Sequence, residues 1–392
     1  MHILLLHPVA QWSLGRVAAV CDREGWRLTI VTIESSTVGA HVTTLHEWIR
    51  VPALSDSPEE LLAQIGSRRF DAVVAGNEFA VIAADVLARE LGLYHNDIAR
   101  IRASRNKALM RQMFEEYDVP QPRTIAELSS VEESRAFGWA GVAFPVIVKP
   151  VDMAMSLFVR KCDSQDEVEE TLAKMSSFKK SRLTNYAFSA DALVEEFVDG
   201  PEFSLECVVQ DGKVVAHSVT QKFVSPLPAC YEIGHISGVD MPQEHRRELL
   251  EVTERIASSW AMAQGVMHVE FKMTSERISI IEAAARPAGD HVPELVELQQ
   301  GLSLEEAYLY ARAGLSWQPG EREPQDTWHG IRFHYDDRSE VPRPATVEVV
   351  QAHDDADGVV PGAEPFSVNR RTGFSMLRSK SLDDLGGYIR VT

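Results

Sequence analysis

The sequence predicts an α/β protein of two or three domains, and three observations lead to this fold class. The chain has 392 residues, more than a single hydrophobic core usually serves. Its first hundred residues alternate between strand-like and helix-like segments. From about residue 327 the pattern changes to short β-like runs separated by polar turns. We therefore expect an N-terminal parallel α/β domain, a central α+β domain and a small β-rich C-terminal unit.

The N-terminal region is expected to form a parallel sheet covered on both faces, because strands alternate with helices along it. The expected elements cover residues 2–6, 12–24, 26–33, 71–76 and 78–93. Such sheets bind ligands beyond the carboxyl ends of their strands, and His7 and Asn77–Glu78 follow two such ends. The region has no Gly-x-Gly-x-x-Gly motif, which disfavours a dinucleotide-binding domain.

The middle of the chain mixes strand and helix signals. A helix is expected to begin after Ser104 and to end before Pro120 and Pro122. Asp211–Gly212 is a strong hairpin signal. Further strands are expected at 144–150, within 192–222, at 268–273 and from 278, and further helices at 163–175, 243–263 and 302–314.

The C-terminal region is expected to be a smaller, separate β-rich unit. Its β-like runs are TWHGIRFHY, ATVEVVQA and GGYIRVT. The segment EREPQD at 321–326 has the composition of a linker before them.

Composition and charge narrow the function classes. Hydrophobic residues make up 45% and charged residues 25% of the chain, an ordinary globular balance. The formal net charge of −19 argues against general binding to nucleic acid or to anionic membranes, because both need a basic surface. It leaves room for ATP, since a few local cations can hold a triphosphate within an acidic protein.

Targeting and redox signals are weak. No apolar stretch approaches the ~18 residues needed to span a bilayer, and the opening MHILLLHPVAQW lacks the basic start and the cleavage site of a signal peptide. We therefore expect a cytoplasmic protein that binds no membrane. Cys21, Cys162, Cys207 and Cys230 are scattered without a Cys-x-x-Cys pair, so neither a disulfide framework nor a zinc site is predicted.

Two lysines and an acidic stretch stand out between residues 104 and 206. Lys149 closes the apolar run FPVIV, where a buried ammonium group would need an anionic partner such as a phosphate. Lys107 lies on the helix after Ser104, and its pattern alone fits a solvated charge. The segment VEEFVDGPEFSLE at 194–206 is rich in carboxylates, and its simplest interpretation is a solvated edge strand.

Glu270 and Glu282 lie on two adjacent apolar strands. A hairpin pairing of these strands would bring both carboxylates onto one face, where they would repel each other without a cation. Oxygen ligands without cysteine or clustered histidine favour Mg²⁺ or Mn²⁺. Arg286, four residues after Glu282, would then lie in the loop beside the metal.

Together these segments resemble the ATP-grasp superfamily from about residue 104 to 314. The matching motifs are, in order, SRNKALMRQMFEEYDVPQP, FPVIVKP, LVEEFVDGPEFSLE, HVEF and IIEAAARPAGD. A single motif of this kind is weak, but five in the expected order are specific. The resemblance implies a pre-grasp α/β domain at 1–103, an ATP-grasp domain at 104–314 with a mobile lid at about 122–197, and a C-terminal subdomain at 315–392.

The resemblance also implies a set of nucleotide and metal contacts. The phosphates would be held by lysines and the phosphate loop, adenine by backbone groups of a hinge, and the ribose by a carboxylate. The residues expected to bind ATP are Lys107, Lys149, Ser156, Glu195, Glu196, Val198, Glu202 and Lys222. Glu270 and Glu282 would bind Mg²⁺, with Mn²⁺ as an alternative.

The remaining expected contacts are with the substrates. Arg286 would stabilise the developing acyl centre. Glu232 and His235, three residues apart in YEIGHISG, resemble the substrate loop of the amino-acid ligase branch, where both act at the catalytic site. A histidine in a loop fits a surface residue equally well. Glu78 could bind a substrate ammonium group.

Two departures from the family pattern stand out. Ala284 occupies the position where most of these enzymes have a metal-binding Asn, and the dipeptide ligase branch shares this loss. The phosphate loop PVDMAMSLFV at 150–159 has Ser156 where expected but no glycine. Met153 and Met155 would have to let the backbone approach the phosphates.

The resemblance implies an ATP-dependent carboxylate–amine ligase that forms an amide through an acyl phosphate. Its partners would be a small carboxylic acid and an amine, most simply two amino acids, in the setting of secondary metabolism. Dimers are frequent among such relatives. Two alternatives stay open: a carboxylase or formyl-phosphate type enzyme with another acceptor, and a nucleotide-binding protein without ligase activity.

Overall fold

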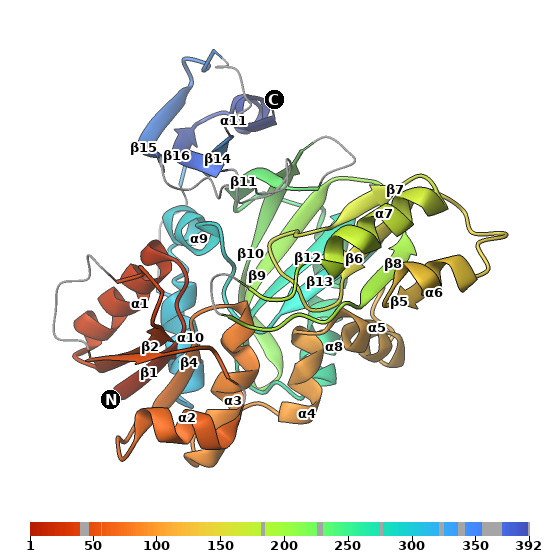
Figure 1. The fold of residues 1–392 in the computed structure, drawn as a ribbon. Coiled ribbons are helices and arrows are strands. Elements are labelled where there is room, and N and C mark those ends of the chain that lie inside the picture. Colours follow the sequence, from red (N-terminus) through yellow and green to blue (C-terminus); the bar gives the residue numbers. More distant parts are fainter. Residues whose placement is uncertain are drawn as a thin grey trace.

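The computed structural model of the chain describes residues 1–39, 47–55, 57–181, 185–225, 230–274, 277–320, 325–335, 342–354 and 371–390. In these residues the strands form a parallel four-stranded sheet, an antiparallel four-stranded sheet and an antiparallel eight-stranded sheet (Figure 1). The mixed α/β fold class is therefore confirmed. No helix of the described segments is long and apolar enough to cross a membrane.

The N-terminal sheet has the strand order β3-β2-β1-β4, and all its pairs are parallel. Its strands are β1 (His2–Leu6), β2 (Arg27–Ile33), β3 (Glu47–Val51) and β4 (Ala72–Ala75). Side chains of β1 alternate between two cores, as the two-residue period of a strand requires. Ile3 and Leu5 pack towards α1 (Gln11–Glu24) and α10 (Leu304–Arg312). Leu4 and Leu6 pack towards α2 (Pro58–Ile65) and α3 (Val81–Glu90).

The antiparallel four-stranded sheet, here called the lid sheet, falls within the segment predicted as the lid. Its order is β5-β8-β6-β7, from β5 (Thr124–Leu128), β6 (Val146–Pro150), β7 (Arg160–Cys162) and β8 (Ala192–Glu196). The helices α6 (Val131–Ala136) and α7 (Gln165–Ser176) pack on it and close a separate small core. Ser130 and Ser164 cap these helices through their side chains.

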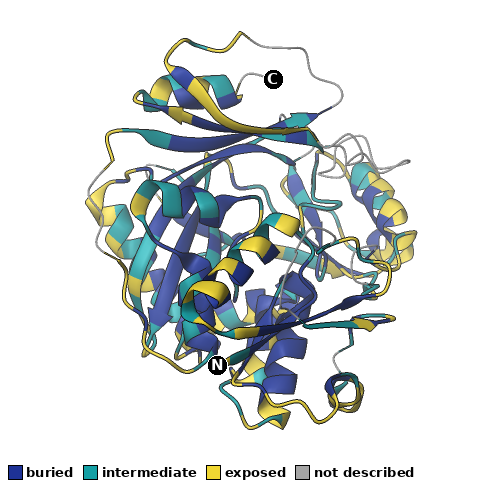
Figure 2. Ribbon diagram, turned by 90° about the vertical axis from the view of Figure 1, so that its left-hand side faces the viewer, coloured by how far each residue is buried: buried dark blue, intermediate teal, exposed yellow. Residues whose placement is uncertain are grey.

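The central sheet has eight strands in the order β13-β12-β9-β10-β11-β14-β16-β15. These are β9 (Glu202–Gln210), β10 (Lys213–Val224), β11 (Glu232–Ser237), β12 (Gly265–Met273), β13 (Ile278–Ala284), β14 (Trp328–Tyr335), β15 (Val347–Asp354) and β16 (Arg371–Ser379). Asp211 and Gly212 connect β9 to β10 with φ angles of 51° and 72°, so the predicted hairpin is confirmed. Figure 2 shows much of the sheet interior as buried.

Helices outside the lid surround these sheets. Besides α1, α2, α3 and α10, they are η1 (Glu78–Ala80), α4 (Ile98–Ile101), η2 (Arg102–Ser104), α5 (Lys107–Glu116), α8 (Gln243–Ser259), α9 (Val292–Gln300) and α11 (Leu382–Arg390). Helix α5 begins at Lys107, later than the predicted start after Ser104, because Ser104 ends the 3-10 turn η2. The side chain of Asn106 caps α5 by accepting from the Leu109 N–H at 3.0 Å.

The C-terminal strands continue the central sheet instead of forming a sheet of their own, because β14 pairs with β11. The prediction of a strand at GGYIRVT is wrong. The described residues of this run, 386–390, lie in α11. Ser381 accepts from the Asp384 N–H at 3.1 Å, and Leu385 and Ile389 are buried at helical spacing. Residues 321–324 of the expected linker lie outside the described segments.

Candidate active site

A cavity of about 340 Å³ lies between the lid sheet and the central sheet. The predicted site residues that line it come from η1, α5, β6, β8, β9, β11, β12, β13 and the loops beside them. They are Glu78, Lys107, Lys149, Ser156, Glu195, Glu196, Val198, Glu202, Glu232, Glu270, Glu282 and Arg286. Lys222 and His235 are buried directly behind this wall, against Glu232.

Lys149 is buried at the end of β6 and bound to Glu195, whose Oε2 lies 2.6 Å from its Nζ. Arg111 binds the same carboxylate at 2.6 Å through Nε. Burial and the neighbouring Arg111 lower the pKa of Lys149 to about 8, although Glu195 opposes this shift. The single carboxylate of Glu195 thus pairs with two cations. The remaining positive charge favours binding of a further anion beside Lys149. Arg111 was not predicted, although it lies one helical turn after Lys107.

The predicted hinge residues lie at the end of β8 and directly after it. The side chain of Glu195 is committed to Lys149, so any adenine contact would come from its backbone. The Glu196 N–H donates to the Arg123 carbonyl at 3.0 Å, which directs an adenine contact of Glu196 to its carbonyl oxygen. Val198 lines the cavity close by. Backbone recognition of adenine by this segment stays a prediction.

Lys107, the first residue of α5, connects the phosphate loop with a candidate metal ligand. Its Nζ lies 2.9 Å from Glu282 Oε1 and donates to the Met153 carbonyl at 2.8 Å. Its backbone N–H donates to the Val151 carbonyl at 2.8 Å. The start of α5 therefore fixes both the loop and the lysine charge.

The phosphate loop takes left-handed backbone conformations without glycine. Met155, Ser156 and Phe158 have φ angles of 61°, 52° and 59°. For residues with a Cβ this region costs roughly 1–2 kcal/mol each. The Phe158 ring packs against Phe178 with centroids 5.6 Å apart, which helps to hold the loop. The loop thus takes conformations that glycine would adopt without this cost, and its contact with phosphate stays a prediction.

Glu270 and Glu282 lie directly opposite each other in the β12–β13 pairing, as the hairpin expectation requires. Each carboxylate has a lysine partner: Lys222 Nζ lies 3.0 Å from Glu270, and Lys107 Nζ lies 2.9 Å from Glu282. Both carboxylates are partly exposed on the cavity wall, and Ala284 next to them offers no side-chain ligand. This all-oxygen pair fits Mg²⁺ or Mn²⁺.

His268 holds Glu270 in place and was not predicted. It precedes Glu270 by two residues on β12, so both side chains lie on the same face. Its ring nitrogens lie 2.7 Å from Glu206 Oε1 and 3.0 Å from Glu270 Oε1. Burial alone would lower the pKa of His268, but Glu206 and Glu270 raise it to about 10.

Glu78 binds two guanidinium groups at the edge of the N-terminal sheet. Arg286 Nε contacts Glu78 Oε2, and Arg105 Nη1 lies 2.9 Å from Oε1. Burial would raise the pKa of Glu78, but Arg286 and Arg105 lower it to about 2. A substrate ammonium group at Glu78 would have to compete with both arginines. Glu78 therefore positions Arg286 on the cavity wall.

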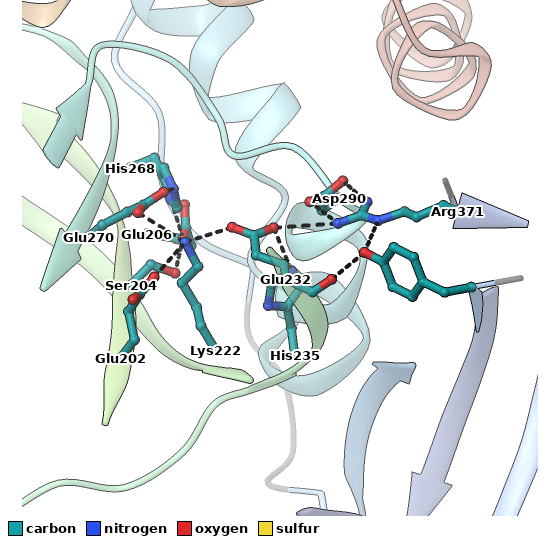
Figure 3. Close-up of polar contacts among 11 residues, drawn as sticks. Glu202, Ser204, Glu206, Lys222, Glu232, His235, His268, Glu270, Asp290 and Arg371 are labelled. Atoms are coloured by element: carbon teal, nitrogen blue, oxygen red, sulfur yellow. Dashed lines mark hydrogen bonds and ion pairs between the residues drawn. The ribbon is translucent and has the colours of Figure 1, made fainter. Parts of the chain in front are cut away.

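Lys222 gathers three carboxylates at the other side of Glu270 (Figure 3). Its Nζ lies 2.7 Å from Glu232, 3.0 Å from Glu270 and 3.3 Å from Glu202. Burial would lower the pKa of Lys222, but these carboxylates raise it well above its usual range. Lys222 thus orients Glu202, the predicted ribose contact, and Glu232, the predicted substrate contact.

Comparison with known proteins finds a matching domain model and a matching fold. Residues 142–294 match the family model of the ATP-grasp domain. The structure is similar to the crystal structure of L-amino acid ligase from Bacillus licheniformis, with a TM-score of 0.75 and 18% identity over 99% of this chain and 96% of that chain. The ATP-grasp domain that the motifs predict is therefore confirmed for residues 142–294, and the likeness to the solved structure shows the fold of the whole chain.

Two further relatives match part of their own lengths. An uncharacterized protein of Sinorhizobium fredii is 24% identical over 77% of this chain and 60% of its own length. Dapdiamide A synthase of Enterobacter agglomerans is 27% identical over 61% of this chain and 56% of its own length. The chain therefore spans less than two thirds of either relative.

Proposed function

We propose that this chain is an ATP-dependent carboxylate–amine ligase that forms an amide through an acyl phosphate and releases ADP and phosphate. One observation carries the proposal. A single cavity of about 340 Å³ gathers two buried lysines, a facing pair of carboxylates and an arginine. These groups match the charges of a nucleotide triphosphate, a divalent cation and an oxyanion.

The residues present fit ATP and its metal. Lys149, with its lowered pKa, and Lys107 would hold the phosphates, and the left-handed phosphate loop would present its backbone N–H groups to them. Glu270 and Glu282 would hold Mg²⁺ or Mn²⁺, which when bound neutralises charge on the phosphates. The phosphate loop without glycine favours a nucleotide-binding protein without ligase activity, whereas the two lysines, the two carboxylates and Arg286 on one cavity wall favour the enzyme.

The chemistry follows from positioning and charge. The substrate carboxylate attacks the γ-phosphorus, the bond to the β-phosphate oxygen breaks, and ADP leaves. The amine then attacks the acyl carbon while Arg286, oriented by Glu78, stabilises the oxyanion. The C–O bond breaks, phosphate leaves with the carboxylate oxygen, and the amide remains. The lid sheet would exclude water from the acyl phosphate.

Amino acids are the proposed substrates, for two reasons. The relatives include proteins named as an L-amino acid ligase and as dapdiamide A synthase. Ala284, which removes one oxygen ligand, also agrees with the amino-acid ligase branch. A carboxylase-type reaction would not need the buried Glu232 and His235 beside the cavity.

The test is phosphate release from Mg-ATP across a panel of amino-acid pairs, with mass spectrometry of each reaction. Release that requires two amino acids, with a product mass equal to their sum minus water, supports the ligase. ATP binding without phosphate release in any pair would contradict it. A Glu282→Gln variant is the matched blank, because it should bind no metal in the productive position.

A further inference from the structure

Three hydrogen-bond acceptors converge beside the cavity, outside the nucleotide contacts. One ligand atom each from Glu232, His235 and Asp290 lies within 4.8 Å of the others. Glu232 and His235 come from β11, and Asp290 comes from the loop after Arg286 (Figure 3). Glu232 lines the cavity, and the Asp290 side chain is 33% exposed, so a small molecule can reach the cluster.

His235 lacks a partner inside this cluster. Its side chain is 1% exposed, and its Nε2 lies 3.5 Å from Glu232 Oε2, too far for a good hydrogen bond. Within the described segments neither ring nitrogen makes a hydrogen bond. A buried nitrogen in this state costs free energy, and the unprotonated ring nitrogen of His235 is free to accept a hydrogen bond from a bound donor.

Arg371 of the C-terminal region holds the Asp290 carboxylate in place. Its Nη1 and Nη2 donate to the two Asp290 carboxylate oxygens at 2.5 and 3.0 Å, and its guanidinium lies 3.6 Å from the centre of the Phe333 ring. Its Nε donates to the Tyr335 hydroxyl at 3.1 Å, and that hydroxyl donates to the Glu232 carbonyl at 2.6 Å. This fork fixes the carboxylate while leaving lone pairs for a further donor.

We propose that Glu232, His235 and Asp290 form a receptor for a primary ammonium group of the acid substrate, with Arg371 as the positioning residue for Asp290. The proposal rests on the proposed function and specifies its substrate class. A primary ammonium group has three N–H donors, which match one acceptor from each residue. Four carboxylates, Glu202, Glu232, Glu270 and Asp290, share the two cations Lys222 and Arg371 here, so an excess of negative charge remains for an ammonium group to offset.

A divalent metal fits this cluster less well. Lys222 Nζ already lies 2.7 Å from Glu232, and Arg371 Nη2 lies 3.7 Å from it. Two resident cations would repel a divalent ion more strongly than a singly charged ammonium group. The ammonium group also donates a hydrogen bond, which the unprotonated ring nitrogen of His235 can accept.

The bound ammonium group belongs to the activated acid and not to the attacking amine. An amine between two carboxylates stays protonated, and a protonated amine has no lone pair with which to attack an acyl carbon. The receptor would therefore select an amino acid for activation and protect its own amino group from acylation. A second, neutral amine supplies the nucleophile.

The test compares amino acids with their deamino analogues as the activated acid. The full chain, Mg-ATP and hydroxylamine are mixed with L-alanine or propionate, L-leucine or 4-methylpentanoate, and L-glutamate or glutarate, and hydroxamate is measured. The account predicts that kcat/KM favours an amino acid over its analogue. Asp290→Asn should reduce this preference roughly 10- to 100-fold, the usual effect of losing a charged hydrogen bond. Arg371→Lys should reduce it less, with the loss mainly in KM.

Asp240→Asn is the matched control, because Asp240 is 91% exposed and pairs with Arg246 at 3.2 Å, away from the cavity wall. It should leave the preference unchanged. Equal hydroxamate formation from amino acids and their analogues would overturn the receptor while the ligase proposal stands. An Asp290→Asn variant that slows both acids equally would also overturn it. No hydroxamate from any acid would overturn the proposed function and the receptor together.

Discussion

The two ends of the cavity are built differently. At the nucleotide end, Lys107 and Lys149 come from regular elements and contact carboxylates on neighbouring strands. At the receptor end, Asp290 lies in a loop with a φ angle of 54°, and its partner Arg371 comes from a strand 81 residues further along the chain. Both ends join segments that are distant in sequence, but the lysines and carboxylates of the nucleotide end lie within recognisable motifs, whereas Arg371 at the receptor end lies in none.

This difference separates a shared reaction from a particular substrate. In the proposed reaction the groups at the nucleotide end serve ATP whichever acid is used, whereas the receptor end would contact the acid alone. Changes at the nucleotide end should therefore abolish activity towards every acid. Changes at the receptor end should alter which acid is used.

The largest expected effect is the loss of a candidate metal ligand. Glu270→Gln or Glu282→Gln should reduce phosphate release about 1,000-fold or more, because several kcal/mol of charge stabilisation are lost with the metal. Thermal unfolding with and without Mg-ATP would show whether the variants are folded. The exposed Glu244→Gln is the control. Retained activity in either variant would exclude that residue as a ligand.

Arg286 should matter nearly as much. Arg286→Gln removes the oxyanion contact, so kcat for amide formation should fall about 100- to 1,000-fold, with little change in the KM for ATP. Glu78 keeps Arg105 as a partner in this variant, so the fold should persist. An equal fall in ATP affinity would place Arg286 at the nucleotide and not at the acyl group.

The lowered pKa of Lys149 predicts that kcat/KM for ATP depends on pH. Its pKa of about 8 means that its charge is lost as pH rises through 8, so kcat/KM for ATP should fall up to tenfold per pH unit above it. Lys149→Gln should have a low kcat/KM without this decline, and the exposed Lys213→Gln should behave like the unchanged chain. A decline that persists in Lys149→Gln would assign it to another group.

Lys149 should affect stability in the opposite direction: kcat/KM for ATP falls as the pH rises, whereas the free energy of unfolding increases. Between about pH 8 and its ordinary pKa of 10.5, Lys149 is neutral in the folded chain and protonated in the unfolded chain. Its contribution to the free energy of unfolding therefore rises with pH over this window. Urea unfolding of the chain and of Lys149→Gln at pH 8 and pH 10 would measure the difference.

The smallest expected effect concerns the strained phosphate loop. Met155→Gly should be about 1 kcal/mol more stable to urea unfolding than Met155→Ala, because glycine accepts a φ of 61° without the steric cost. Met155→Ala is the matched control, since it removes the same exposed side chain but keeps the strain. Equal free energies of unfolding for the two variants would contradict a role for the backbone strain.

The sequence predicted the parts of the site that lie in short motifs. Lys149, Glu270 and Glu282 were found because a charge in an apolar strand is unusual. His268 and Arg111 could have been found by the same logic, since they lie two residues from Glu270 and four from Lys107 on the same faces. Both were missed because their partners, Glu206 and Glu195, are distant in sequence.

Arg371 and its pairing with Asp290 could not have been predicted from local patterns. Nothing in the run RTGFSMLRS distinguishes Arg371 from a solvated strand residue, and only the β14–β16 pairing brings it to the site. The C-terminal helix was missed for a related reason. Its two glycines, Gly386 and Gly387, weaken the local helix signal, while burial of Leu385 and Ile389 stabilises the helix.

The central claim is that the substrate carboxylate attacks the γ-phosphorus of ATP. It is tested most directly with an amino acid labelled with ¹⁸O in its carboxylate, followed by mass spectrometry of the released phosphate. The account predicts one ¹⁸O atom in each phosphate, because the acyl phosphate passes one carboxylate oxygen to it. Unlabelled phosphate, or ¹⁸O found in AMP, would contradict the acyl phosphate mechanism.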